Sequence, residues 1–78
     1  MSKADKMFKA MWYEKTLDDD HNIFYEKFWA GANCTEIIAF NMKYKMVEIS
    51  YDKDNIVAAF NVEQHLAVHE KLTEMGWL

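Results

Sequence analysis

The hydrophobic and polar positions near the start of the chain follow a helical period. Apolar residues recur at spacings of three and four, at Ala4, Met7, Phe8 and Met11, which places them on one helical face. Ser2, with Asp5 three residues later, forms a capping pattern at the start of this segment. The pattern predicts a short amphipathic helix that docks on other elements, because about ten helical residues are marginal alone.

A second helical pattern runs from residue 62 to residue 75. Asn61 is a good N-cap, and Gln64 stands where it can complete a capping box. Gly76 is a suitable left-handed stop, after which Trp77 and Leu78 are predicted to dock on the fold. The residues on the predicted covered face are His65, Val68, His69, Leu72 and Met75. The residues expected to face water are Glu63, Gln64, Glu70, Lys71 and Glu74.

Between the helices the period changes to that of strands. Alternating or aromatic-rich segments cover residues 13–17, 23–29, 35–41 and 45–51, and a short fifth strand at 56–60 is left open. Polar or loop-like stretches separate them at 18–22, 30–34, 42–44 and 52–55. In the fourth segment Val47, Ile49 and Tyr51 are expected to point inward.

This order of elements predicts an α+β fold. Strands that follow one another through short turns form an antiparallel meander, here of four to five strands, and both helices then cover one face of the sheet. The chain contains no proline, low-complexity tract or internal repeat. We therefore expect residues 1–78 to form a single domain.

Composition and charge narrow the classes of function. Hydrophobic residues make up 51% of the 78 positions and aromatic residues 15%, which is typical of a folded globule. The net charge of −4 disfavours non-specific binding to nucleic acid or anionic membranes. Without a long apolar run, and with a start too polar for a signal peptide, the chain is expected to be cytoplasmic.

The two ends of the chain carry a family resemblance. The segment from Lys3 to Lys15, which opens Lys-Ala-Asp-Lys-Met-Phe, and the segment from Glu70 to Leu78, which ends Met-Gly-Trp-Leu, resemble short uncharacterised proteins of prophages and mobile elements in low-GC Gram-positive bacteria. The family pattern is Lys-Ala-Asp-x-Met-Phe near the start and Leu-Gly-Trp at the end, with Gly where this chain has Trp12. The resemblance covers about a quarter of the chain. It implies a bacterial or phage setting and brings no catalytic residues.

His65 and His69 are the strongest candidates for metal ligands, because a spacing of four places both imidazoles on one helical face. The zinc-protease motif requires Glu after the first His, but this chain has Leu66. The candidates for a third ligand are Glu70, His21 and Cys34. We interpret the two histidines as packed side chains, and we predict no metal site and no cofactor.

Other reactive side chains have equally plain interpretations. The acidic run from Asp18 to Asp20 with His21 lacks the glycine and closing glutamate of a calcium loop, so we predict a solvated hairpin turn. Cys34 is the single cysteine, which rules out an intramolecular disulfide and indicates a reduced thiol. Hydroxyl groups occur in neither a nucleophile-elbow nor a phosphate-loop context. We expect no catalysis.

The surplus of aromatic residues is the main clue to function. The candidate interface consists of Phe24, Tyr25, Phe28, Trp29 and Trp77. A sheet covered on one face leaves its other face open, and exposed aromatic patches bind proteins. We expect a protein–protein interaction or self-association. The alternative is a nucleic-acid-associated regulator, since aromatic residues on a sheet can stack bases, although the acidic balance disfavours it.

Overall fold

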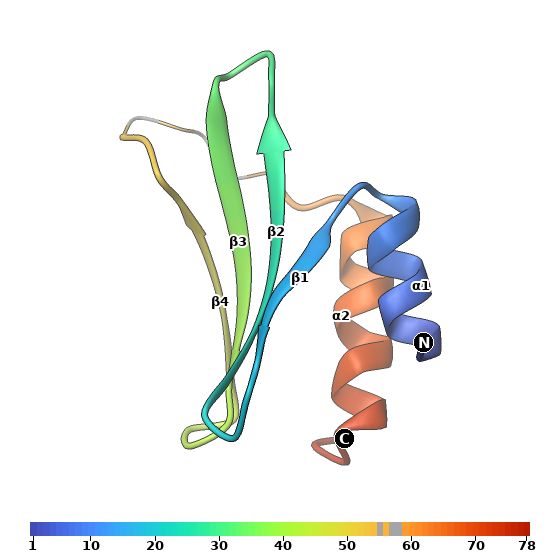
Figure 1. The fold of residues 1–78 in the computed structure, drawn as a ribbon. Helices are drawn as coiled ribbons and strands as arrows, with labels where there is room; N and C mark the ends of the chain where they lie inside the picture. Colours follow the sequence, from blue (N-terminus) through green and yellow to red (C-terminus); the bar gives the residue numbers. More distant parts are fainter. Residues whose placement is uncertain (55, 57–58) are drawn as a thin grey trace.

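The computed structural model describes residues 1–54, 56 and 59–78 and shows two layers, a sheet and a helix pair (Figure 1). The elements are α1 (Lys3–Ala10), β1 (Glu14–Asp18), β2 (Asn22–Trp29), β3 (Cys34–Asn41), β4 (Met46–Tyr51) and α2 (Val62–Glu74). The strands form one antiparallel sheet in the order β1-β2-β3-β4. Both helices lie on the same face of this sheet. The predicted α+β meander with four strands is confirmed.

The fifth strand proposed for residues 56–60 falls partly outside the described residues, at 57 and 58. The described residues of this segment, Ile56, Ala59 and Phe60, belong to no strand. One other local prediction is confirmed. The turn predicted at residues 18–22 connects β1, which ends at Asp18, to β2, which begins at Asn22. In it the Asp19 carboxylate accepts the backbone N–H groups of His21 and Asn22, each at 2.8 Å.

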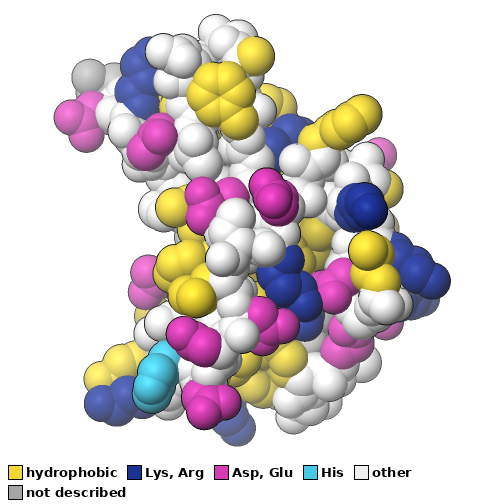
Figure 2. Space-filling model, viewed as in Figure 1, with side chains coloured by type: hydrophobic (Ala, Val, Ile, Leu, Met, Phe, Trp, Pro, Cys, Tyr) yellow, Lys and Arg dark blue, Asp and Glu magenta, His cyan; other side chains and the backbone are white. Residues whose placement is uncertain are grey.

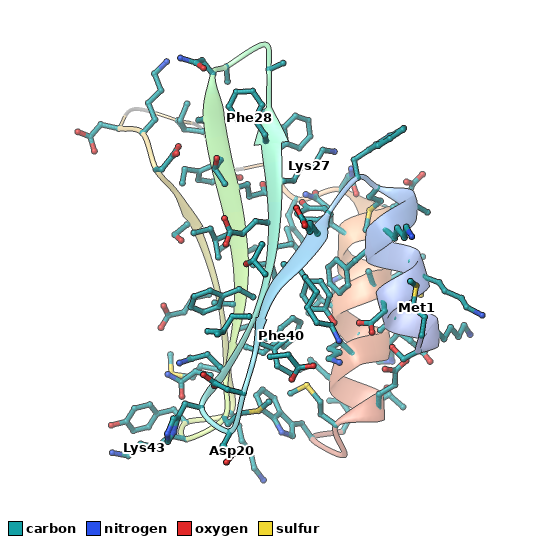
Figure 3. The ribbon with its side chains drawn as sticks, viewed as in Figure 1. Met1, Asp20, Lys27, Phe28, Phe40 and Lys43 are labelled. Atoms are coloured by element: carbon teal, nitrogen blue, oxygen red, sulfur yellow. The ribbon has the colours of Figure 1, made fainter. Side chains whose placement is uncertain are left out.

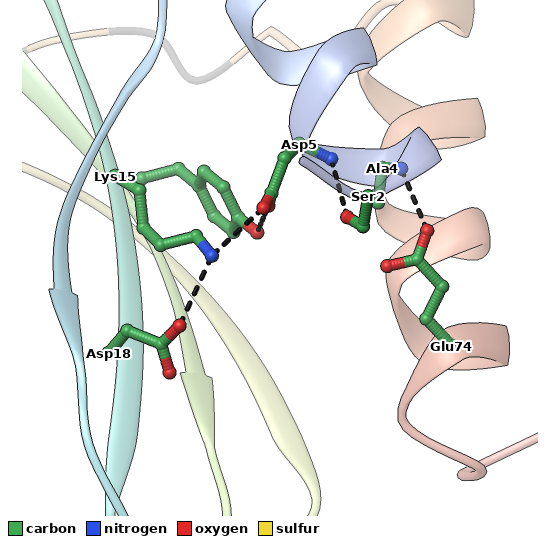
Figure 4. Close-up of polar contacts among 7 residues, drawn as sticks. Ser2, Ala4, Asp5, Lys15, Asp18 and Glu74 are labelled. Carbon is green, nitrogen blue, oxygen red and sulfur yellow. Dashed lines mark hydrogen bonds and ion pairs between the residues drawn. The ribbon is translucent and has the colours of Figure 1, made fainter.

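Local capping chemistry sets where α2 begins. The Asn61 side chain accepts the N–H of Gln64, and the Gln64 side chain accepts the N–H of Asn61, at 2.8 and 2.7 Å. This is the predicted capping box. The end of α2 also holds the start of α1, because the Glu74 carboxylate accepts the N–H of Ala4 at 2.8 Å (Figure 4). A carboxylate is favourable there, since the first-turn N–H groups of a helix lack backbone partners.

Both helices end in the same backbone motif. At the end of α2, Gly76 has a φ of 75°, and the next N–H, of Trp77, donates to the Leu72 carbonyl. At the end of α1, Trp12 has a φ of 73°, and the next N–H, of Tyr13, donates to Phe8. This Schellman geometry favours glycine at the left-handed position. Trp12 therefore occupies a position that favours glycine.

Replacing Trp12 with glycine is expected to raise the free energy of unfolding by about 1 kcal/mol, because a left-handed L-residue is strained by about 1–2 kcal/mol. The greater freedom of glycine in the unfolded chain offsets part of this gain. The Trp12 side chain is 84% exposed, so little packing is lost. Urea denaturation measures the change. Trp12→Ala removes the ring but keeps the strain, so equal stability of the two variants would contradict this explanation.

The core lies between the helices and the middle strands. The ring of Phe8 stacks on Tyr25 with centroids 4.0 Å apart, and Tyr13 and Phe40 meet it edge-on. From α2, Ala67 joins the same buried cluster. On β2 and β3 the side chains that alternate inward are buried: Ile23, Tyr25, Ile38 and Phe40. Because side chains alternate along a strand, these buried residues define which positions of the sheet face the helices and which face away from them.

The predicted face of α2 is partly wrong. Val68, Leu72 and Met75 are half-buried and pack against the core, but His65 and His69 are exposed. The most buried residues of α2 are Gln64, Ala67 and Lys71, and two of these were expected to face water. The helix is turned this way because Gln64 bonds the Tyr13 hydroxyl at 2.7 Å and Lys71 lies 5.9 Å from the Tyr25 ring.

Candidate functional site: the uncovered face of the sheet

The sheet has one face that the helices leave uncovered, which we call the outer face. Side chains on a strand alternate between faces, and directly paired residues share a face. Because Tyr25 points into the core, its neighbour Phe24 points outward, together with its partners Leu17 on β1 and Ala39 on β3. Figure 3 shows the contrast, with Phe40 and Lys27 on the side of the helix layer.

Apolar side chains form a continuous patch on this face. The apolar patch consists of Leu17, Phe24, Phe28, Ile37 and Ala39. Phe28 is 60% exposed, and the other four are half-buried. Cross-strand pairing brings them together, because Phe24 lies opposite both Leu17 and Ala39, and Ile37 is diagonal to Phe24 and Phe28. Contiguous exposed apolar surface of this kind is characteristic of interaction sites.

Carboxylates lie beside the apolar patch and, at Glu26, within it. Glu14 and Glu26 face each other across β1 and β2, and Glu48 lies opposite Ala39 on β4. Figure 2 shows acidic and apolar side chains next to one another over the part of the sheet near β1. Like charges directly opposite each other destabilise a sheet, and among the described residues the Thr16 hydroxyl alone donates to Glu26. This pair is therefore suited to a cationic partner group.

The lysines of the strands point away from this face. Lys15 pairs with Tyr25, so both lie on the helix side. Lys27 also faces that side, with its ammonium 3.8 Å from the centre of the Trp29 ring. None of the strand residues that the structure places on the outer face is basic. The outer face consequently combines the apolar patch with negative charge, from Glu14 and Glu48 on the outer strands and from Glu26 between Phe24 and Phe28.

The residues proposed from sequence as an interface do not all meet. Phe24 and Phe28 lie together on the outer face, but Tyr25 is buried, so its assignment to the interface was wrong. Trp29 lies on the helix side at the end of β2 under Lys27. Trp77 is half-buried, with its ring 6.5 Å from that of Phe40. The structure thus brings together only two of the five residues.

The other three members of the apolar patch were not predicted from the sequence. Leu17, Ile37 and Ala39 were placed in strands but not assigned to the open face. The alternation within β3 contained the signal, since Ile37 and Ala39 stand between Glu36, Ile38 and Phe40, which are buried. The bordering glutamates carried no signal of their own, because isolated acidic residues are common on strands that face water.

A second polar cluster surrounds the buried carboxylate of Glu36, which is 1% exposed. It accepts hydrogen bonds from the hydroxyls of Tyr13 and Tyr51, the latter at 2.7 Å, and the Gln64 amide donates to the Tyr13 hydroxyl at 2.7 Å. Burial and the hydrogen bond to Glu36 raise the pKa of Tyr51 to about 12. The same causes raise the pKa of Tyr13 above its ordinary range. These groups bind one another, so the cluster is structural.

A third cluster lies at the base of a groove of about 580 Å³ between α1 and β1. The Lys15 ammonium is 2.9 Å from Asp5 and 3.1 Å from Asp18, and the Tyr25 hydroxyl donates to Asp5 at 2.5 Å (Figure 4). Burial opposes ionisation of Asp5, but the bonds from Tyr25 and Lys15 outweigh it and lower its pKa. Asp5 and Lys15, which line this groove, are therefore paired with each other.

The predicted absence of a metal site stays a prediction. His65 and His69 are exposed on α2, which corrects their interpretation as packed side chains. Within residues 1–54, 56 and 59–78, no three His, Cys, Asp or Glu side chains converge as a metal-binding group. Cys34 is a free, buried thiol at the start of β3.

The fold and the uncovered sheet face place the protein in the class of small two-layer α+β domains that have one sheet face available for contact. No helix in the described part of the chain is long and apolar enough to cross a membrane. No protein-family model, curated protein or solved structure matches the chain.

Proposed function

We propose that this protein is a non-catalytic accessory protein that binds another protein through the outer face of its sheet. The observation that carries the proposal is the apolar patch around Phe24 and Phe28, bordered by carboxylates and free of basic strand residues. Protein interfaces commonly combine an apolar, aromatic centre with a polar rim.

The charges on this face specify the chemistry of the partner. Glu14 and Glu26 repel each other across the strands, so a lysine or arginine placed between them gains attraction and relieves the repulsion. An apolar side chain of the partner, placed next to that cation, would cover Phe28, which follows Glu26 on the same face of β2. The partner surface is therefore a protein surface with an apolar centre and a basic rim.

A nucleic-acid partner is the alternative, and two observations bear on it. Phe24 and Phe28 could stack on bases, as aromatic residues do on other RNA-binding sheets. Binding of nucleic acid, however, depends on lysine and arginine contacts to phosphates, and the outer face presents carboxylates instead. The charge pattern favours a protein.

The proposal also includes a bacterial prophage or mobile-element origin, a cytoplasmic location and the absence of catalysis. The resemblance at both ends of the chain supports a bacterial prophage or mobile element, and the acidic composition suits a cytoplasmic protein. Catalysis usually depends on polar groups left available to substrate. Among the described residues, each buried side-chain nitrogen or oxygen has a hydrogen-bond partner within the protein.

An affinity experiment tests the proposal. Immobilised wild-type protein is incubated with nuclease-treated lysate of a low-GC Gram-positive bacterium, and bound proteins are quantified by mass spectrometry. We expect Phe28→Ser and Glu26→Lys to lower recovery of a specific partner about tenfold, which corresponds to about 1.4 kcal/mol. The control is Leu66→Ser, which changes a side chain of α2 that is 51% exposed.

Two outcomes would contradict this function. A partner recovered equally by wild type and both outer-face variants would bind elsewhere on the molecule. A partner recovered from a parallel lysate without nuclease but not from the treated one, with recovery that falls steeply with added salt, would instead indicate nucleic acid.

A further inference from the structure

The two edges of the sheet differ in how they are protected. β1 has five residues, carries a register shift between Lys15 and Leu17, and lies next to α1. Short strands, bulges and edge lysines are devices that keep a sheet edge from pairing with another chain. β4 has six residues and pairs with β3 in unbroken register from Met46 to Tyr51. The edge formed by β4 lacks these devices.

The backbone groups on the free side of β4 can be identified. The N–H of Asp52 donates to the carbonyl of Thr35, which lies directly opposite in the register of β3 and β4. Hydrogen-bonded pairs alternate along an antiparallel ladder. The N–H and C=O groups of Val47, Ile49 and Tyr51 therefore point away from β3, toward the free edge.

The side chains along this edge are incompletely covered. Val47, Ile49 and Tyr51 face the helix side, since they pair with Phe40, Ile38 and Glu36. The helices pack mainly on the middle strands β2 and β3, and β4 is the strand farthest from them (Figure 1). As a result, Ile49 is 38% exposed although it points inward.

We propose that β4 pairs antiparallel with β4 of a second copy of this chain, with Ile49 opposite Ile49 of the other copy. In this register the outward-pointing backbone groups of the three edge residues bond in both directions across the two-fold axis. On the helix side Val47 lies opposite Tyr51, a favourable β-branched and aromatic pair. On the outer face Glu48 lies opposite Ser50, whose hydroxyl can donate to the carboxylate.

Charge and pairing exclude the neighbouring registers. A two-fold axis perpendicular to the sheet requires a residue to face its own copy, so the register can move only in whole steps. Centring on Glu48 places two carboxylates directly opposite each other, and centring on Ser50 places Glu48 opposite Asp52 twice. Centring on Val47 leaves Tyr51 without a partner. Within β4 the register at Ile49 is the one in which charge, hydrogen bonds and apolar pairs agree; Lys45 and Lys53, which lie opposite each other in it, are outside the strand.

The dimer extends the proposed function without depending on it. A two-fold axis perpendicular to the sheet keeps both helix pairs on one side and joins the sheets into a single sheet. The two outer faces then lie side by side on the other side. Such a pair of identical sites would bind a repetitive or dimeric partner more tightly than a single copy could.

The mass of the protein in solution tests the dimer. Sedimentation equilibrium over a wide range of concentrations is expected to show wild type approaching twice the 9.3 kDa of the chain. Ile49→Pro removes an N–H that the single copy does not use, which an edge strand tolerates, and Ile49→Lys adds an edge charge. Both variants are expected to weaken association by about tenfold or more, whereas Leu66→Lys on α2 associates as wild type does.

Circular dichroism confirms that each variant is folded. Wild type that stays monomeric at the highest concentration would overturn the proposal. Equal association of wild type and both Ile49 variants would also overturn it, by showing that another surface pairs.

Cross-linking tests the register independently. At a hydrogen-bonded position on the two-fold axis the Cα atoms are about 5.5 Å apart, which suits a disulfide. Ile49→Cys is therefore expected to form an intermolecular disulfide faster than Glu48→Cys or Ser50→Cys, with wild type as the control for Cys34. Faster cross-linking at position 48 or 50 would show that the copies pair in a different register.

Discussion

Replacing Phe8 with alanine is expected to lower the free energy of unfolding by about 3–5 kcal/mol. The Phe8 ring is buried, stacks on Tyr25 at 4.0 Å and meets the rings of Tyr13 and Phe40 edge-on. It packs α1 against β2 and β3. Its removal leaves a cavity bounded by three rings, which cannot close it without leaving their own contacts.

Urea denaturation followed by far-UV circular dichroism measures this loss. A domain of 78 residues has modest total stability, so we expect the variant to be partly unfolded without denaturant. Phe28→Ala is the matched control, because it removes the same ring from the outer face and is expected to change stability by about 0.5 kcal/mol or less. Similar losses for both variants would show that the helix layer does not rest on Phe8.

The local structures that the sequence predicted correctly are formed by residues that lie close together in the sequence. The capping box needs only Asn61 and Gln64, which lie three positions apart, and the structure reproduces it in full. The same holds for the turn at Asp19, where one carboxylate accepts two nearby N–H groups. The change from helical to strand period also predicted the two helices and four strands.

The face of α2 could not be predicted because its polar partners are remote in sequence. Gln64 is buried through a bond to the Tyr13 hydroxyl, 51 residues away, and Lys71 lies over the ring of Tyr25. A helical pattern read by hydrophobicity places such residues in water. His65 and His69 were assigned to the core instead because they share a stripe with Val68.

The interface was only partly predictable for a related reason. β2 carries aromatic rings on both faces, Phe24 and Phe28 on one and Tyr25 on the other. Alternation separates these residues into two groups but does not say which group the helices cover. The helices cover the face that carries Tyr25, because Phe8 of α1 stacks on the Tyr25 ring. Phe24 and Phe28 therefore remain on the open face.

Replacing Glu36 with glutamine is expected to lower the free energy of unfolding at neutral pH by about 2–3 kcal/mol, because hydrogen bonds to a charged group are worth about 1.5–3 kcal/mol each. The carboxylate accepts from Tyr13 and Tyr51, both of which are donors. A glutamine presents an N–H₂ group to one of them and leaves a donor facing a donor. Glu48→Gln on the outer face, where the carboxylate is exposed, is the control and is expected to have little effect.

The difference between wild type and Glu36→Gln is also expected to depend on pH. Burial and Glu36 raise the pKa of Tyr51 to about 12 in the folded protein and also raise that of Tyr13, whereas an unfolded tyrosine has a pKa of about 10. The resulting stability is fully present below about pH 10 and is lost toward pH 12, because the unfolded chain releases its protons first. Without the Glu36 charge the two phenols are shifted less, so Glu36→Gln loses less stability over this range. Urea denaturation from pH 8 to about pH 12 should show the two proteins converging, and a constant difference would mean that the phenols do not donate to Glu36.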